Sequence, residues 1–238
     1  MLVSPKKGNA RTGVQIDIEM PEGLKQDGWY LLLPNHQSWV DIVLLFNVFH
    51  RRIPFLKFFL KYELIYVPFL GIACKALNMP FMKRYSQSYL ARHPEKQGED
   101  LLRTRQACAT FNEHPVAIVN FMEGTRRTPR KMKEQQSPYQ NLLHPKAGGV
   151  AFVLSALGPC MQSALDVTSV YPEGVLSLVD LACGHIRHVK IHVQACTIPV
   201  DFRGGDYEND AQYRHRFQSW IGELWKAKDV RISSMLNS

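Results

Sequence analysis

The chain lacks the motifs of several common classes of protein. It has five cysteines, an odd number with no Cys-x2-Cys pair, so neither a disulfide framework nor a zinc motif is indicated. A reducing compartment is the simplest interpretation of this cysteine usage. The Gly-x-Ser-x-Gly sequence of serine hydrolases and the Gly-x4-Gly-Lys phosphate loop are both missing. The sequence therefore gives no support to serine hydrolysis or nucleotide hydrolysis.

Long apolar runs are missing as well. The first 30 residues contain no apolar segment of the kind found in signal peptides. Residues 147–165 are uncharged, but Gly148-Gly149 and Gly158-Pro159 interrupt them, whereas a membrane span needs about 20 apolar residues. We expect a buried helix of about 11 residues followed by a loop here. No transmembrane helix is expected in this chain.

Acidic residues are fewer than basic ones, 21 against 29, and the net charge is +8. Such a charge favours an anionic partner: a phosphate-bearing substrate, an anionic membrane surface or nucleic acid. Many of the basic residues lie in segments 51–61 and 126–133, and no nucleic-acid-binding module is recognisable. We therefore expect no nucleic-acid partner.

Strand and helix patterns alternate along the chain, which predicts an α/β layered fold with a central, largely parallel sheet flanked by helices. Antiparallel strands near the C-terminus would make this sheet mixed. Residues 1–27 are polar and weakly patterned, so we expect a single domain over 28–238 preceded by this segment. The expected strands are 29–34, 79–83, 115–122, 166–171 and 188–198. The expected helices are 38–50, 54–67, 97–112, 146–157 and a long C-terminal helix.

The apolar stripe of that C-terminal helix is expected to be core packing rather than a binding site. Its members recur at helical spacing. They are Tyr213, Phe217, Trp220, Ile221, Leu224 and Trp225.

The most informative stretch is residues 35–41, Asn-His-Gln-Ser-Trp-Val-Asp, directly after an apolar strand. A helix turns about 100° per residue, so His36 and Asp41 can meet only if His36 precedes the helix and Asp41 lies in its first turn. Ser38 as the N-cap would place Asp41 at the third helical position, as in a capping box. The carboxylate would then fix the imidazole tautomer and leave the other ring nitrogen as a base. The alternative is a capping acid beside an ordinary turn histidine.

A second motif ends the strand that reaches Met122. Glu123, Gly124, Thr125 and Arg126 follow it directly. Ligands of open α/β folds bind at the carboxyl ends of strands, so a charge pair and a flexible glycine at this point indicate a binding site. The alternative is a surface turn with a local ion pair.

Together the two motifs resemble those of the glycerolipid acyltransferases, the 1-acyl-glycerol-3-phosphate acyltransferase family. Two further blocks match less closely. Asn78 stands where the family has glycine in the block that ends at Arg84, and Thr168 stands where a first proline is common, ahead of Pro172. With these two departures, the chain resembles the lysocardiolipin-acyltransferase-like branch of the family, including its bacterial members. The resemblance covers roughly residues 25–230.

This resemblance implies an enzyme of phospholipid biosynthesis. It would move a fatty acyl group from acyl-CoA or acyl carrier protein to a hydroxyl of a lysophospholipid, with no other cofactor. His36 would be the general base, and Asp41 would orient it. No acyl-enzyme is required, because the activated hydroxyl attacks the thioester directly.

Six residues are implied to bind substrate. Two arginines among them would hold the phosphate of the acceptor, a task that suits the guanidinium fork. A lysine ahead of a glycine pair is a weaker candidate for help near the donor, and backbone amides at the start of the helix after Ser38 are candidate oxyanion donors. The six are Arg84, Glu123, Gly124, Thr125, Arg126 and Lys146.

Two other functions stay open. One is an acyltransferase with a non-glycerolipid acceptor, which keeps His36 and Asp41 but need not keep both arginines. The other is a non-enzymatic membrane-surface protein on the same scaffold. A metal site is not expected, because on a strand His188 and His192 share a face that His185 does not.

The resemblance also implies a peripheral protein on the cytoplasmic face of a membrane, a bacterial inner membrane if the branch holds. Segment 51–77 is the expected contact with an anionic membrane surface, because it combines basic residues such as Lys57 and Lys61 with aromatic ones such as Phe55 and Tyr66. The alternative is that these aromatic residues form part of the core.

Overall fold

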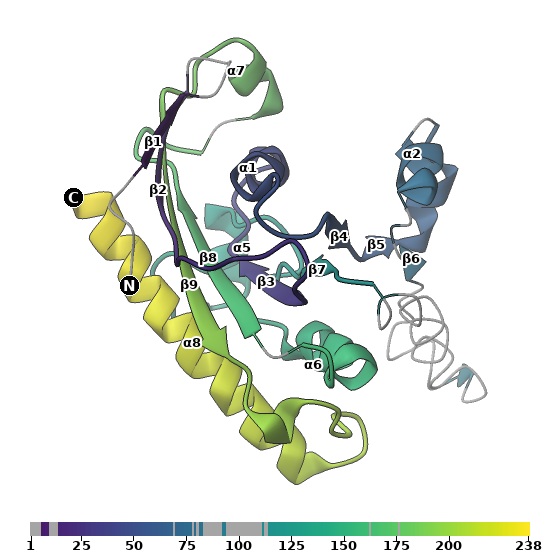
Figure 1. Cartoon of the computed structure of the whole chain (residues 1–238). Helices are drawn as coiled ribbons and strands as arrows, with labels where there is room; N and C mark the ends of the chain where they lie inside the picture. The colour runs from purple at the N-terminus through teal and green to yellow at the C-terminus, as the bar shows by residue number, and fades with distance from the viewer. Residues whose placement is uncertain are drawn as a thin grey trace.

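A seven-stranded mixed sheet forms the centre of the protein (Figure 1), in the order β1-β2-β9-β8-β3-β7-β4. The computed structural model describes residues 6–9, 14–68, 70–77, 79, 81–82, 92–93, 111, 114–161, 163–175 and 177–238. The pairs β2–β9, β3–β8, β3–β7 and β4–β7 are parallel, and β1–β2 and β8–β9 are antiparallel. The predicted α/β fold with a largely parallel sheet is therefore confirmed. The strands are β1 (Lys6–Asn9), β2 (Gln15–Glu19), β3 (Tyr30–Pro34), β4 (Leu56–Phe58), β7 (Ala117–Val119), β8 (Ser163–Val170) and β9 (His188–Thr197).

Helices cover both faces of this sheet. One buried cluster includes residues of α1, and a second includes residues of α6 and α8 on the opposite face. A separate two-stranded sheet pairs β5 (Leu60–Lys61) with β6 (Phe81–Met82). The helices are α1 (Val40–Phe49), η1 (Tyr62–Tyr66), α2 (Leu70–Ala76), α5 (Pro129–Glu134), α6 (Ala147–Leu157), α7 (Leu178–Ala182), η3 (Val200–Phe202) and α8 (Ala211–Asn237).

The central strand β3 explains the apolar run ahead of the first motif. Leu32 belongs to the cluster under α1, whereas Leu31 and Leu33 belong to the cluster under α6 and α8. A strand that is buried on both faces needs a continuous apolar sequence rather than an alternating one. The polar residues that follow β3 therefore emerge at the carboxyl end of the sheet, where the parallel strands β4, β7, β3 and β8 end.

The C-terminal helix and α6 match their predictions. The aromatic stripe of α8 packs in the second cluster, around the fully buried Phe217 and Trp225. The α6 helix spans Ala147–Leu157, as its interrupted apolar run predicted. Within the described part of the chain, no helix has the length and apolar character needed to cross a bilayer.

The N-terminal polar segment is the first departure from prediction. Its residues form β1 and β2, and β2 pairs with β9 from Gln15 opposite His188 onward. Ile16 and Ile18 supply the apolar positions of β2 on one face, a pattern too short to identify a strand by alternation. The sheet therefore starts before residue 28, and part of the segment expected to precede the domain belongs to it.

The prediction of a helix over residues 54–67 is wrong. This region forms β4, which pairs with β7, and then β5 and η1. Leu56 and Phe58 are buried while Phe55 is half exposed, so burial follows a period of two. Over so few residues the aromatic spacing fits both periods, and pairing with β7 decides between them. The helix expected at 97–112 falls outside the described residues, apart from residue 111.

Candidate active site

His36 and Asp41 meet at the carboxyl end of β3. Nδ1 of His36 lies 2.9 Å from Oδ2 of Asp41, and the two side chains are 12% and 2% exposed. Because a carboxylate accepts, Nδ1 carries the proton and Nε2 is the unprotonated nitrogen of the neutral ring. Among the described residues, Nε2 has no hydrogen-bond partner. Asp41 therefore fixes the tautomer of the imidazole through Nδ1, and Nε2 is left as the base.

The carboxylate of Asp41 is held by four donors. Oδ2 accepts the His36 ring N–H and the backbone N–H groups of Gln37, at 2.7 Å, and Ser38, at 2.9 Å. Oδ1 accepts the hydroxyl of Tyr171 at 2.5 Å. A buried carboxylate with this many charge-assisted hydrogen bonds has one favoured orientation.

The start of α1 differs from the prediction by one residue. Trp39, not Ser38, occupies the N-cap position, and no side chain caps the helix. The carboxylate of Asp41 instead accepts the backbone N–H groups of Gln37 and Ser38. The Val40 N–H donates to the Ser38 hydroxyl at 3.2 Å. These three amides are already bonded within the protein and are therefore poor candidates for the oxyanion donors expected at the start of this helix.

The rest of His36 is fixed from three more directions. Its backbone N–H donates to Oε1 of Glu123 at 2.7 Å, and its carbonyl accepts the Arg127 N–H at 2.8 Å. Its ring stacks on Phe121, with centroids 4.0 Å apart and planes at 25°. These contacts join the two sequence motifs into one site.

Glu123 lies beneath the surface of the site, bonded to the backbone of the loop that carries His36. Its side chain is fully buried, and its second oxygen accepts the Leu143 N–H at 3.1 Å. Burial raises the pKa of this carboxyl to about 7, although its two backbone hydrogen bonds and Lys228 act in the opposite direction. A carboxyl buried in this position can shape the acceptor site by holding the His36 loop in place, and direct contact of Glu123 with substrate stays a prediction.

Replacing Glu123 with glutamine is expected to lower the free energy of unfolding by about 1–3 kcal/mol, because the amide nitrogen would face a buried N–H donor. It should also change the pH dependence. Because the pKa is raised from 4.5 to about 7, the folded protein keeps the Glu123 proton at pH values between these two limits, whereas the unfolded chain has released it. The stabilisation is complete below this window and is lost as pH rises through it, by up to about 3 kcal/mol.

Denaturant unfolding at about pH 5 and about pH 8 measures both effects. The loss of stability between the two values should be smaller in Glu123→Gln than in the wild type. Glu134→Gln is the matched control, because Glu134 is an exposed acid on α5 paired with Arg130. An unchanged pH dependence in Glu123→Gln would contradict the assignment.

The turn after Glu123 brings the remaining predicted residues together. Gly124 has φ of 67°, and a Cβ there would lie 3.2 Å from Cδ and Nζ of Lys146. Lys146 therefore lies over this turn, and a side chain at position 124 would meet both backbone strain and Lys146. The hydroxyl of Thr125 accepts from Lys131 at 2.5 Å.

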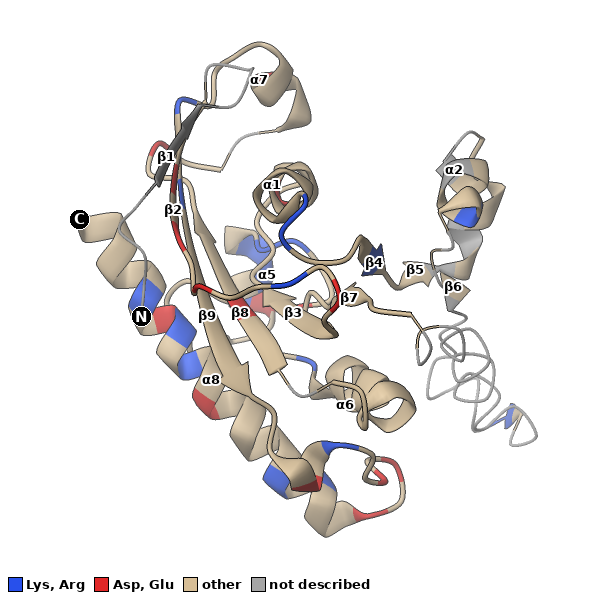
Figure 2. Cartoon of the chain, viewed as in Figure 1, with Lys and Arg blue, Asp and Glu red and all other residues tan. Residues whose placement is uncertain are grey.

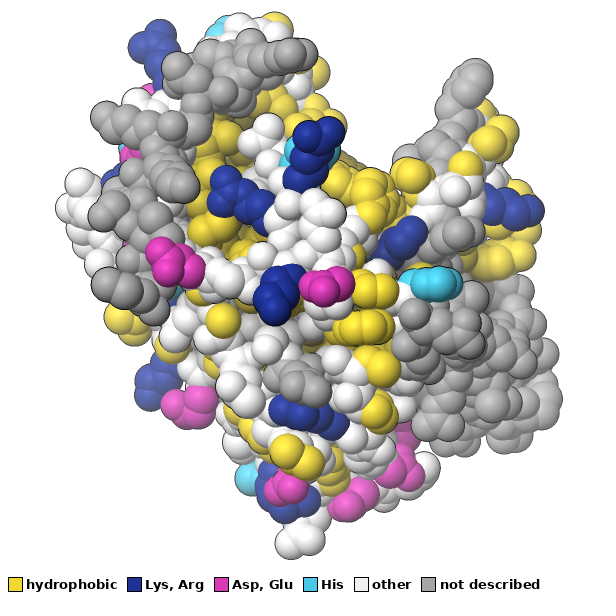
Figure 3. Space-filling model, in the orientation of Figure 1, with side chains coloured by type: hydrophobic (Ala, Val, Ile, Leu, Met, Phe, Trp, Pro, Cys, Tyr) yellow, Lys and Arg dark blue, Asp and Glu magenta, His cyan; other side chains and the backbone are white. Residues whose placement is uncertain are grey.

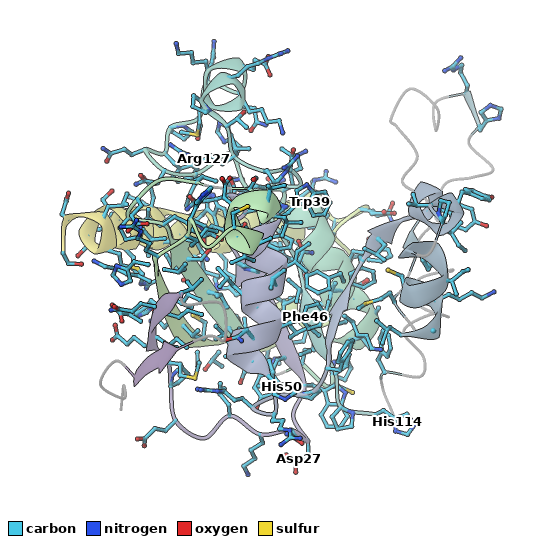
Figure 4. All side chains as sticks on the ribbon, turned by 90° about the horizontal axis from the view of Figure 1, so that it is seen from above. Asp27, Trp39, Phe46, His50, His114 and Arg127 are labelled. Carbon is cyan, nitrogen blue, oxygen red and sulfur yellow. The ribbon has the colours of Figure 1, made fainter. Side chains whose placement is uncertain are left out.

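Arg126 is exposed at the mouth of this turn. Its guanidinium carbon lies 5.3 Å from the ring centroid of Trp39, a half-exposed residue at the start of α1. Seen from above (Figure 4), Trp39 and Arg127 lie together at the amino end of α1, and His50 lies at its other end. Arg84, the second predicted phosphate ligand, lies outside the described residues.

Sequence reasoning missed the partners that come from far along the chain. The buried side chain of Asn35 donates to the Ser169 carbonyl at 2.9 Å and accepts its N–H at 2.8 Å, which links the first motif to β8. The Tyr171 hydroxyl reaches Asp41 from just beyond β8. For Asn35 the motif itself was a signal, whereas Tyr171 had none beyond its place before Pro172.

A buried lysine from α8 also supports the site. Nζ of Lys228 donates to the carbonyls of Leu33, at 2.7 Å, and Val167, at 2.6 Å, and pairs with Asp166 at 2.6 Å. It therefore ties the ends of β3 and β8 together directly beneath the first motif. No pattern around Lys228 distinguishes it from the exposed charges of α8.

The three histidines near β9 pair with separate carboxylates. His188 lies 2.7 Å from Asp17, and His185 lies 3.2 Å from Asp180. His192 is 4.0 Å from a carboxylate oxygen of the neighbouring strand β2. The partners of His188 and His192 lie on β2 and become their neighbours only when the sheet forms, whereas His185 pairs with an acid five positions before it.

Comparisons with known proteins point to one family. A family model described as acyltransferase matches residues 15–175, which include both motifs. The chain is 22% identical over 241 residues to the 2-acyl-1-lysophosphatidylinositol acyltransferase of Saccharomyces cerevisiae. This similarity covers 82% of the chain and 58% of the yeast protein, so the chain spans little more than half the length of that relative.

Proposed function

The chain belongs to the acyltransferase family, and from this premise we propose that it moves a fatty acyl group from a thioester to a hydroxyl of a lysophospholipid. The thioester is acyl-CoA or acyl carrier protein. The observation that carries the proposal is the His36–Asp41 pair at the carboxyl end of the sheet, in which Nε2 of His36 has no hydrogen-bond partner within the described part of the chain. The acceptor class is supported by the name of the yeast relative.

In the proposed reaction, Nε2 of His36 takes the proton of the acceptor hydroxyl as its oxygen attacks the thioester carbonyl. The new C–O bond gives a tetrahedral intermediate, which expels the thiolate. The proton held on Nε2 then passes to that thiolate. Asp41 stabilises the imidazolium between these two steps, and no acyl-enzyme forms.

The turn that follows Glu123 is the proposed source of oxyanion donors. The backbone N–H groups of Thr125 and Arg126 have no acceptor among the described residues, whereas the Gly124 N–H is bonded to the Phe121 carbonyl. The Arg127 N–H donates to the His36 carbonyl, which places this turn beside the base. Fixed backbone donors of this kind are suited to charge that develops on a carbonyl oxygen.

A turnover screen with purified protein tests the proposal. Lysophospholipids with phosphate, inositol phosphate and cardiolipin headgroups are offered with acyl-CoA or acyl carrier protein, and release of free thiol is measured. We expect transfer to at least one lysophospholipid. Transfer only to amine or sugar lipids would favour the non-glycerolipid alternative, and no transfer to any acceptor would contradict an enzymatic role.

Arg126→Ala is expected to raise the apparent KM for a phosphate-bearing acceptor roughly 10- to 150-fold, because a charge-assisted hydrogen bond contributes about 1.5–3 kcal/mol. The KM for the acyl donor should change little. Steady-state kinetics with each substrate varied in turn gives both constants. The same expectation holds for Arg84.

Arg130→Ala is the matched control, because Arg130 is exposed on α5 and already paired with Glu134. Equal effects of Arg126→Ala on the two substrates would mean that the phosphate lies elsewhere. No effect on either would favour an acceptor without phosphate.

The structure changes which residues are candidates for membrane contact. Lys57 is half-buried, burial lowers its pKa, and its ammonium donates to the Leu77 carbonyl. It is therefore a poor candidate for contact with lipid. Large exposed apolar side chains instead follow β4 and β8: Tyr66 and Ile72, each 75% exposed, and Val179 in α7, 69% exposed.

These segments lie at the same edge of the sheet as His36, because β4, β7, β3 and β8 run parallel. Figure 1 shows α2 and α7 at one end of the molecule, and Figure 3 shows hydrophobic side chains around the notch at that end. Basic residues of α5, visible in Figure 2, follow the end of β7 and add positive charge. We propose that this edge faces an anionic bilayer.

The double variant Ile72→Asp, Val179→Asp is expected to weaken binding to anionic vesicles at least about tenfold, because burying one such side chain contributes about 1.5–3 kcal/mol. Wild-type binding should also weaken as salt is added. Vesicle flotation measures both effects.

Val200→Asp is the control. Val200 is 74% exposed and lies in η3, which follows the carboxyl end of β9. Because β9 runs antiparallel to β8, η3 lies at the end of the sheet opposite to the one proposed to face the membrane. Flotation of the double variant equal to that of Val200→Asp would show that this edge is not the contact surface.

A further inference from the structure

Tyr171 is the first residue after β8, and its side chain turns inward. It is buried, and its hydroxyl donates to Oδ1 of Asp41 at 2.5 Å, across 130 positions of the sequence. The other three donors to Asp41 act on Oδ2 and come from residues 36–38, within five positions of it. Among the described residues, Tyr171 alone therefore fixes the far oxygen of this carboxylate.

We propose that Tyr171 is a positioning residue that acts through Asp41 on the base His36, so that the reacting unit is His36–Asp41–Tyr171. This inference rests on the proposed acyl transfer. Tyr171 does not touch the reacting atoms. Its effect is on the orientation and the charge of the carboxylate behind the base.

Two physical consequences follow from the contact. With Oδ2 and Oδ1 both bonded, the carboxylate cannot rotate, so the Nδ1–H of His36 keeps its acceptor throughout the reaction. The phenol also takes part of the negative charge of Asp41, which weakens the hold of the carboxylate on an imidazolium. His36 would then release its proton to the departing thiolate more readily.

The chemistry of the phenol suits this role. Burial and the neighbouring Asp41 raise the pKa of Tyr171, so it stays protonated and can only donate to the carboxylate. The other charged groups around the pair act at longer range: Glu123 through the His36 backbone, and Lys228 through Glu123. None of these groups bonds to Oδ1.

A purely structural role is the competing explanation, and the pH profile separates the two. Removing the hydroxyl by Tyr171→Phe should lower kcat/KM roughly 10- to 150-fold, the range expected for a hydrogen bond to a charged group. It should also move the acid limb of the pH–rate profile upward by up to about one pH unit, because Asp41 would hold the imidazolium more strongly.

Tyr213→Phe is the matched control, since it also removes a buried tyrosine hydroxyl, here bonded to the Phe202 carbonyl at 3.3 Å, and lies away from the pair. It should leave the acid limb in place. If Tyr171→Phe gives the same profile as Tyr213→Phe, the inference is overturned.

A difluorinated tyrosine at position 171 keeps the test decisive if Tyr171→Phe does not fold. This more acidic phenol has nearly the same shape and donates more strongly, so the acid limb should move in the opposite direction, to lower pH. An unmoved limb would overturn the inference. If His36→Ala abolishes transfer but neither change at position 171 alters the profile, only this inference fails, whereas a wild type with no transfer would contradict the proposed function itself.

Discussion

His36→Ala is expected to lower acyl transfer by about 10²- to 10⁴-fold or more, the usual contribution of a general base. The protein should still fold. The contacts that hold this loop use the backbone N–H and carbonyl of residue 36, which alanine keeps. The ring itself is partly exposed and contributes its stacking on Phe121. Initial rates together with circular dichroism check both statements.

His50→Ala is the control for His36→Ala, because His50 is an exposed histidine at the other end of α1 (Figure 4). It should retain wild-type activity. A folded His36→Ala protein that keeps more than about a tenth of the wild-type rate would rule out His36 as the general base.

Asp41→Asn is expected to lower turnover by a similar factor, because an amide no longer fixes the tautomer that leaves Nε2 free as a base. Stability should fall as well. An asparagine oxygen can serve one side of the carboxylate site, but its NH₂ group must then face either the Tyr171 hydroxyl or the donors on Oδ2. That mismatch should cost about 1–3 kcal/mol.

Rate and melting temperature measured on the same samples separate catalysis from capping. If Asp41 were only a helix cap, the variant would lose at most about 1 kcal/mol and keep its activity. Asp210→Asn is the control, because Asp210 is the N-cap of α8 and accepts the N–H groups of Gln212 and Tyr213. Both N–H groups donate to the same oxygen, which an asparagine amide oxygen can replace, so this control should change stability little and keep its turnover.

The contact of His36 with Asp41 was predictable because it is local. Five positions separate the two residues, and helix geometry with a strand before it leaves few ways for them to meet. The β3 strand was also predictable from local sequence, because a strand buried on both faces needs a continuous apolar run. The roles of these residues in catalysis, the acyl donor and the bacterial branch stay predictions.

The contacts of Glu123, Tyr171 and Lys228 were not predictable in this way. Each joins segments between 20 and 195 positions apart, and each depends on which strand ends lie side by side. The burial of Glu123 shows the difference most clearly: its motif marked it as part of the site, but only the fold shows that it lies beneath the surface. Similarly, the pairing of β4 with β7 overrode a helical spacing that local sequence favoured.

The sheet order has a consequence for how the protein can be divided. The region that matches the family ends at residue 175, before β9 and α8. A fragment cut there would remove β9 from between β2 and β8, so β2, which lies inside the matched region, would lose its parallel neighbour. It would also leave the Leu33 and Val167 carbonyls without the Lys228 ammonium and strip the aromatic cover from one face of the sheet. The region that defines the family is therefore shorter than the unit that can fold around its own active site.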